Sequence, residues 1–258
     1  MLKETSSFLA LCGVFILALI GVSILRLYPD WLDWPLARAL NNLTKVHPRA
    51  TELAYWAAYP IVEGLISVSL IWYAWFSSPS PESRAKLVIG TAAAVLAGLA
   101  SHFLRYQLPP APKPIFDPLL QLHTPSVFGA IDTLRANSFP DSPTFPSERA
   151  VLFAGLSLAI LMVRRDLGLL SLGCFAVIEF SRVYLGLHYL TDIAGSFLLA
   201  GVFVALAQLP WCVEAGRWFL KWERAWPWAF YGCALLASVQ LITAFHELRL
   251  LLRLVTKS

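Results

Sequence analysis

Seven apolar stretches, most of them long enough to cross a membrane as a helix, limit what this chain can fold into. They cover residues 8–27, 54–77, 86–105, 148–163, 167–187, 189–209 and 226–247. A bilayer-spanning helix needs about 20 predominantly apolar residues. Charged residues make up 14% of the chain, against about 25% in soluble domains, and the mean hydropathy is +0.65. The sequence therefore predicts an all-α, polytopic helical membrane protein with six core transmembrane helices and an additional C-terminal helix.

Charge and cysteine usage exclude several kinds of site. The net charge of +4 is small and is spread over loops, so no nucleic acid is expected as a partner. The four cysteines lie in or beside apolar stretches without close pairing, so neither a disulfide framework nor a zinc site is expected. We find no internal repeat and no domain boundary. Residues 1–258 are expected to form a single integral-membrane domain.

The loop 106–147 differs from the rest of the chain. It joins the third and fourth apolar stretches outside the membrane and is rich in proline. Residues 116–135 within it are expected to form a short helix on the membrane interface, with apolar side chains towards lipid. A long structured loop in a compact domain is usually functional, which makes this loop a place to look for a site.

The segment 181–192 carries the densest set of polar side chains within an apolar region. On a helix, His188 and Asp192 are four residues apart and share a face, and Ser181 lies two turns before His188. Asp192 can then fix one imidazole nitrogen while the other points at a substrate. Arg182 adds a permanent cation with donors suited to phosphate oxygens. The alternative is that these residues are two helix caps and an arginine without a functional role. This alternative explains each residue by itself, but it does not explain why all of them occur together at this spacing.

Alternation of the spans predicts that several distant polar residues meet at one membrane face. The turns after the third and fifth spans must emerge on the same side. This side receives Arg105, Lys113, Ser147, Arg149, Arg182, His188 and Asp192. Four cations around one histidine favour a strongly anionic ligand, and phosphate is the obvious one. Glu179, three residues before Arg182, can pair with it and position it, and Glu63 is a second carboxyl at membrane depth.

The pattern Ser181-Arg182-x5-His188-x3-Asp192 resembles the last motif of the type 2 phosphatidic acid phosphatase superfamily of membrane lipid phosphatases and phosphotransferases. The resemblance covers roughly residues 86–209, and residues 210–258 look like an addition. It implies that Arg182 binds phosphate, that His188 becomes phosphorylated and that Asp192 orients His188. It also implies that Arg105, Lys113 and Ser147 hold the phosphoryl oxygens.

Two motifs depart from the family. Where the family has Lys-x6-Arg-Pro, the chain has Arg105-x7-Lys113-Pro114, with the charges exchanged and one residue inserted. A lysine holds phosphate only as a point charge, without the bidentate geometry of a guanidinium. The proline-rich spacer can equally be local stiffening of the loop.

The second departure changes the chemistry. The family's Pro-Ser-Gly-His is Pro146-Ser147-Glu148-Arg149 here, so an arginine replaces the histidine that protonates the leaving group. Arg149 cannot donate a proton, but it can neutralise a departing anion. A phosphate monoester, with a second pKa of about 6, can leave unprotonated, whereas an alkoxide cannot. The substitution thus favours a phosphoanhydride substrate, unless Glu148 or His123 serves as a replacement acid or catalysis has been lost.

These residues predict an integral-membrane lipid phosphatase or phosphotransferase that acts on a polyprenyl (di)phosphate or related lipid phosphate through a phosphohistidine. Arg149, His188 and Asp192 would be catalytic, and no cofactor or metal is expected. The alternative is a non-catalytic protein that binds, flips or assembles lipid phosphates on a degenerate phosphatase scaffold. Expected partners are the lipid substrate and membrane lipids.

Basic residues in short segments predict the orientation. One face carries Lys3, Arg84, Lys86, Arg164, Arg165, Arg217, Lys221 and Arg224. The positive-inside rule puts this face in the cytoplasm, and the histidine site on the periplasmic face of a bacterial inner membrane. The basic residues Arg249, Arg253 and Lys257 oppose this orientation if the last stretch spans.

Overall fold

The computed structural model describes residues 2–78, 80–108, 112–128 and 143–243, which form α-helices and two short 3₁₀ turns, with no β-strand among them. The helices are α1 (Leu2–Leu27), α2 (Asp33–Val46), α3 (Pro48–Ala57), α4 (Pro60–Ser77), α5 (Pro81–Gln107), α7 (Glu148–Leu161), α8 (Arg165–Tyr184), α9 (Leu190–Ala207), α10 (Pro210–Ala225) and α11 (Pro227–Ile242). The turns are η1 (Pro114–Phe116) and η2 (Ser126–Phe128). The all-α prediction is confirmed.

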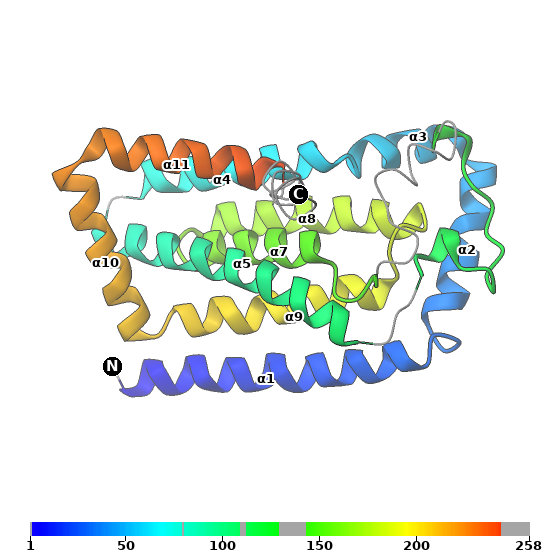
Figure 1. Cartoon of the computed structure of the whole chain (residues 1–258), viewed down its shortest axis with the longest axis horizontal. Coiled ribbons are helices and arrows are strands. Elements are labelled where there is room, and N and C mark those ends of the chain that lie inside the picture. Colours follow the sequence, from blue (N-terminus) through cyan, green and yellow to red (C-terminus); the bar gives the residue numbers. More distant parts are fainter. Residues whose placement is uncertain (1, 79, 109–111, 129–142, 244–258) are drawn as a thin grey trace, which may run out of the picture.

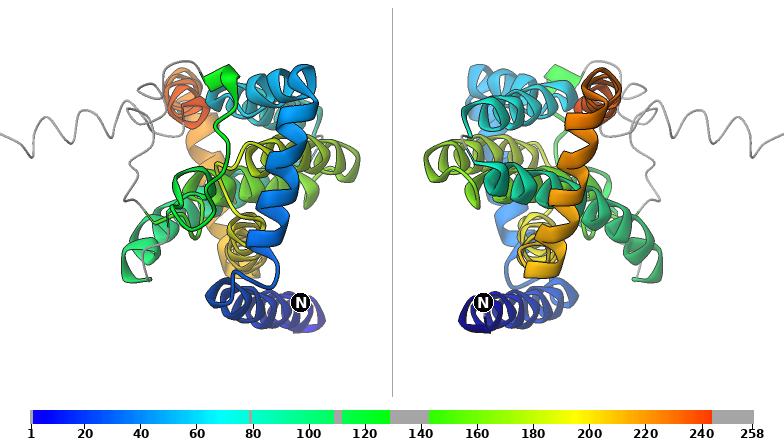
Figure 2. Two further views of the ribbon diagram at one scale, coloured as in Figure 1. Left: turned by 90° about the vertical axis from the view of Figure 1, so that its right-hand side faces the viewer. Right: turned by 90° about the vertical axis from the view of Figure 1, so that its left-hand side faces the viewer.

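The long helices run side by side along one axis and are crossed at each end by a shorter helix (Figures 1 and 2). α7 lies at the centre and packs against α5, α8 and α9, while α1 packs on the outside of α9. α2 crosses the end of the bundle where α1 finishes, and α10 crosses the opposite end (Figure 1). Residues 112–128, which follow α5, and the turn between α8 and α9 both lie at the α2 end (Figure 1).

Within the described residues, four helices are long and apolar enough to cross a membrane: Thr5–Leu27, Pro81–Arg105, Arg165–Tyr184 and Leu190–Ala207. The number rises to six if each of two bent helix pairs is one span, α3 with α4 at 51° and α10 with α11 at 119°. The predicted fourth span is α7, which has only 14 residues. Such a helix is about 21 Å long, shorter than a hydrocarbon core of about 30 Å. The structure therefore supports four to six spans.

Small residues let the central helices approach closely. A Cβ atom added at Gly155 in α7 would lie 2.7 Å from Cβ of Ala94 in α5. One added at Gly90 in α5 would lie 2.7 Å from Cβ of Ala159 in α7. Both alanines are fully buried in the bundle, and all residues from Ala150 to Ile160 are buried. Packing of this kind is typical of helices that associate within a lipid bilayer.

The outer helices expose large apolar side chains. On α1 these include Val14 and Leu17, which are 62% and 71% exposed. On α8, Val177 and Phe180 are 64% and 56% exposed. An apolar surface of this extent on long helices is unfavourable in water and is compatible with an integral-membrane protein.

The structure revises the expected interfacial helix and locates the start of the expected C-terminal helix. Residues 116–128 do not form an α-helix, since residues 118–120 form a turn and residues 121–125 have no regular structure between η1 and η2, and Pro118 and Pro125 restrict helical geometry. The rest of the predicted interfacial helix, 129–135, lies outside the described residues. The predicted seventh span begins as α11 after the sharp bend at Pro227 and is described to residue 243. The basic residues of the tail lie beyond that limit.

Candidate active site

The chain turns sharply between α8 and α9, and this turn presents His188. α8 ends at Tyr184, Gly186 has a positive φ of 72°, and α9 begins at Leu190. Glycine adopts this backbone conformation readily because it has no Cβ atom. The carbonyl of Gly186 accepts a hydrogen bond from the N–H of Ile115 at 3.0 Å, which ties the proline-rich loop to the turn.

This turn corrects one expectation from the sequence. Ser181, His188 and Asp192 do not share a face of one continuous helix, because α8 has ended before His188. Ser181 donates its hydroxyl to the carbonyl of Val177 at 2.8 Å within α8. His188 and Asp192 are nevertheless adjacent, with Nδ1 of the imidazole 3.4 Å from Oδ2 of the carboxylate. The two groups are in electrostatic contact without the alignment of a hydrogen bond.

The other imidazole nitrogen faces a cation and a hydroxyl. Nε2 of His188 lies 3.2 Å from NH2 of Arg182 and 3.4 Å from Oγ of Ser147. A guanidinium only donates hydrogen bonds, so Nε2 must accept and therefore carries no proton. The proton of the neutral ring then resides on Nδ1, on the side of Asp192. The electron pair of Nε2 therefore faces Arg182 and Ser147, two groups that can hold an anion.

Burial and the charge of Arg182 keep the pKa of His188 below its usual value, and the nearby carboxylate of Asp192 only partly opposes them. The free histidine titrates at a pH of about 6.5. The lowered pKa leaves His188 neutral at neutral pH, which is the state in which its nitrogen can act as a nucleophile.

Asp192 is held by groups from three other parts of the chain. Its Oδ1 accepts from Nε of Arg26 at 3.2 Å and from the hydroxyl of Thr144 at 3.4 Å. Its Oδ2 accepts from the N–H of Tyr189 at 3.0 Å, which caps the start of α9. Arg26 also reaches Thr144 at 3.2 Å and lies 3.8 Å from Asp33. The last turn of α1 therefore fixes the carboxylate that faces His188.

Ser147 brings the beginning of α7 into the same site. It is the N-cap of α7, and its hydroxyl accepts from the N–H of Ala150. Its own N–H donates to Oγ of Ser196 at 2.9 Å, and Ser196 in turn donates to the carbonyl of Asp192 at 2.6 Å. The N-termini of α7 and α9 are thus joined. Helix N-termini carry a partial positive charge that favours an anion.

The four cations expected from the sequence lie close enough to influence one another. Burial, followed by the charges of Arg182, Arg149 and Arg105, lowers the pKa of Lys113 to about 8. Among the described residues, Lys113 forms no ion pair with a carboxylate. A half-buried ammonium group that feels the charges of three guanidinium groups is unfavourable, and a bound anion would relieve the repulsion. The electrostatics of the site therefore favour an anion.

Carboxylates position two of these arginines. Oε1 of Glu179 accepts from NH1 of Arg182 at 2.8 Å, as the sequence suggested, and Glu63 of α4 interacts with the same pair. Oε1 of Glu148 lies 3.0 Å from NH2 of Arg105 and also contacts Nδ1 of His102. Glu179 thus orients the guanidinium group of Arg182, and Glu148 orients that of Arg105.

The two alternative acids are placed differently. Glu148 is adjacent to Arg149 but its carboxyl is engaged with Arg105 and His102. His123 is exposed, and its backbone exchanges two hydrogen bonds with the side chain of Asn41, at 2.7 and 2.9 Å. His123 is therefore not one of the groups that contact His188.

Sequence reasoning missed the residues that support Asp192. Arg26 and Asp33 are 166 and 158 positions away from their partners Asp192 and Thr191. The only local signal was a single arginine at the end of an otherwise apolar stretch, which also fits an ordinary interface anchor. Thr144 and Ser196 had no distinguishing pattern.

Comparisons with models of protein families, with curated proteins and with solved structures found no match to this chain.

Proposed function

We propose that the chain is an integral-membrane lipid phosphatase or phosphotransferase that acts on a polyprenyl diphosphate or related lipid phosphate. The observation that carries the proposal is the contact between Arg182 and the unprotonated Nε2 of His188, together with the charges of Arg182, Arg149 and Arg105 that act on Lys113. The motif around Arg182, His188 and Asp192 resembles that of the type 2 phosphatidic acid phosphatase superfamily and adds support.

In the proposed reaction, Nε2 of His188 attacks the terminal phosphorus of the lipid diphosphate. The bond to the bridging oxygen breaks, and the lipid monophosphate leaves with that oxygen and its electron pair. Arg182, Lys113, Arg105 and the Ser147 hydroxyl hold the phosphoryl oxygens. Asp192 stabilises the positive charge that develops on the imidazole. Water, or the hydroxyl of an acceptor in a transferase, then takes the phosphoryl group and restores His188.

We place the site on the periplasmic face of a bacterial inner membrane. The support is the basic residues at the end of the bundle that carries α10, which include Arg84, Arg164, Arg217 and Arg224 in short segments. Basic short segments favour the cytoplasmic side. His188 lies at the opposite end of the bundle.

Catalysis is tested by incubating the purified full-length protein with a polyprenyl diphosphate labelled at the terminal phosphorus. Release of labelled phosphate is expected, together with label on the protein after a denaturing alkaline quench, which preserves phosphohistidine. Lipid binding without release and without labelled protein would contradict the enzyme. That result would favour the non-catalytic lipid-phosphate binder, whose support is the replacement of the family's acid by Arg149.

Arg149 is expected to set the choice of leaving group. Arg149→Ala should lower kcat/KM for the diphosphate by about 10²–10³-fold, the usual effect of removing one preorganised donor. Arg149→His should raise activity on the lipid monophosphate relative to the diphosphate, because histidine can protonate an alkoxide at neutral pH. The measurement is the ratio of the two kcat/KM values. Arg38→Ala is the control, since Arg38 is an exposed arginine on α2 at the same end of the molecule. A ratio unchanged by Arg149→His would remove the preference for diphosphates.

A further inference from the structure

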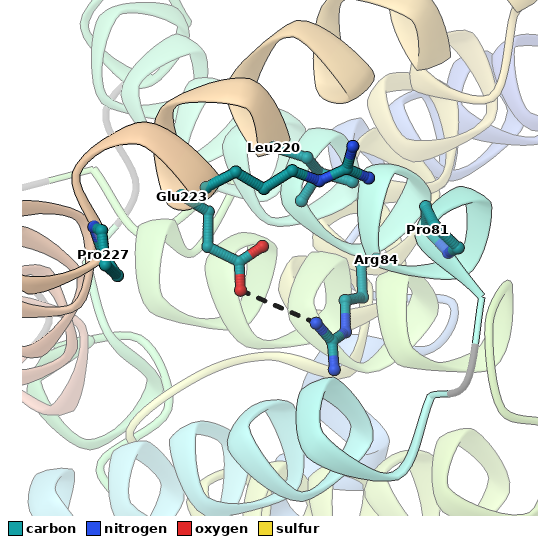
Figure 3. A pocket seen from close by; sticks show the side chains of 6 residues that line it. Pro81, Arg84, Leu220, Glu223 and Pro227 are labelled. Atoms are coloured by element: carbon teal, nitrogen blue, oxygen red, sulfur yellow. Dashed lines mark ion pairs between the residues drawn. The ribbon is translucent and has the colours of Figure 1, made fainter.

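A cavity lies at the end of the bundle opposite to His188. It has a volume of about 250 Å³ and is lined by Pro81, Arg84, Leu220, Glu223, Arg224 and Pro227 (Figure 3). These residues come from the start of α5, the end of α10 and the start of α11. A water molecule takes about 30 Å³ of liquid volume, so the cavity has room for a larger polar group.

Two arginines and one carboxylate give the cavity its charge. NH1 of Arg84 lies 3.6 Å from Oε1 of Glu223, and the same oxygen accepts from the hydroxyl of Tyr231 at 2.6 Å (Figure 3). The guanidinium of Arg84 is also held over the ring of Trp75, 5.2 Å from its centre. Its buried Nε has no hydrogen-bond partner. Arg224 forms no ion pair within the described part of the chain. The lining therefore has more positive than negative charge.

Helix geometry adds further positive charge. α5 begins at Pro81 and α11 begins at Pro227, and both prolines line the cavity. The first N–H groups of a helix have no partner within the helix and carry part of its positive end charge. Ser80 caps α5, but no side chain caps the start of α11. Donors at that helix end remain available beside Arg224.

The surroundings of the cavity indicate the depth at which it lies. α10 and the start of α11 expose Trp211, Trp218, Trp226 and Trp228, which are 71%, 66%, 57% and 74% exposed. Tryptophan concentrates at the level of lipid head groups. α10 also crosses the ends of the long helices, as a helix lying in the interface would (Figures 1 and 2).

We propose that this cavity binds the phosphate group of an anionic phospholipid, held by Arg84, Arg224 and the start of α11. The proposal is independent of the reaction at His188, because the two sites lie at opposite ends of the bundle. A phospholipid bound in this cavity, in addition to the lipid substrate at His188, would fix α10 and α11 against the membrane surface.

The test is a titration of the detergent-solubilised full-length protein with phosphatidylglycerol, followed by native mass spectrometry. Arg224→Gln is expected to weaken binding about tenfold, as loss of one charge-assisted contact does. Arg217→Gln is the matched control, because Arg217 is an exposed arginine of α10 outside the cavity. It should change the affinity less than about twofold. Thermal unfolding of each variant checks that the fold is retained.

Two further arms identify the source of the phosphate. Phosphatidylcholine should bind more weakly than phosphatidylglycerol, because its choline cation offsets the charge of the phosphate. Inorganic phosphate should fail to displace phosphatidylglycerol at millimolar concentration. Equal losses in Arg224→Gln and Arg217→Gln would overturn the proposal, since general charge attraction would then explain binding. Displacement by inorganic phosphate would overturn the assignment to a lipid and point to a soluble phosphate.

Discussion

Replacement of His188 by glutamine is expected to abolish turnover while leaving the binding of a lipid diphosphate nearly unchanged. Loss of a catalytic nucleophile costs up to about 10⁶-fold in kcat. Glutamine is similar in size, and its amide oxygen can still accept from Arg182, which lies 3.2 Å from Nε2 in the native protein. Lys113, Arg105 and Arg149 are untouched, so the attraction for the anion persists.

The measurements are kcat with a labelled polyprenyl diphosphate and the dissociation constant of the same lipid. His123→Gln is the matched control, because it makes the same chemical change at an exposed histidine outside the site. It should retain activity. Turnover that survives His188→Gln would refute the phosphohistidine mechanism. A large loss in His123→Gln would instead identify His123 as the missing general acid.

Arg26→Met is expected to lower both stability and turnover, although Arg26 lies on α1, far from His188 in the sequence. Arg26 donates to Asp192, whose side chain is fully buried, and faces Asp33. Removing one partner of a buried pair destabilises a protein by about 3–5 kcal/mol, because the remaining charge is left uncompensated. Without Arg26, the carboxylate of Asp192 would also attract a proton on the imidazole of His188 more strongly.

The pH dependence of kcat/KM can separate the role of Arg26 in positioning Asp192 from its contribution to stability. Without the cation of Arg26, Asp192 stabilises the protonated imidazole more effectively, so the pKa of His188 should rise. The acidic limb of the profile should then move to higher pH, whereas a merely structural loss leaves it in place. Arg26→Lys, which retains the charge, should restore part of both effects. Arg38→Met is the control for the loss of an arginine. An Arg26→Met variant with native stability and an unshifted profile would exclude this role.

The helices could be predicted from the sequence because a long apolar run in a bilayer must satisfy its backbone groups locally. α1, α5, α8 and α9 lie where the apolar stretches predicted them. The angles of the bends could not be predicted in the same way. Prolines at the start of α4 and α11 mark where a helix can begin, but they do not fix the angles of 51° and 119° between successive helices.

Within the site, Arg182, His188 and Asp192 could be recognised because they are close in the sequence and have an informative spacing. That spacing suggested a continuous helix, and the left-handed Gly186 ended it. The adjacency of His188 and Asp192 survived because Asp192 caps the next helix through Tyr189 N–H.

The sequence by itself determined the helical class, the end of the bundle at which the cations gather and the residues proposed to react. These properties follow from local composition, spacing and the alternation of helices. Only the tertiary structure decided that Arg26 from α1 supports Asp192, that Glu148 orients Arg105 and that Arg84 and Arg224 line a cavity at the α10 end of the bundle. These contacts join helices distant in the chain. They are fixed by how helices pack, because an isolated arginine in a sequence has no particular partner until packing brings a carboxylate to it.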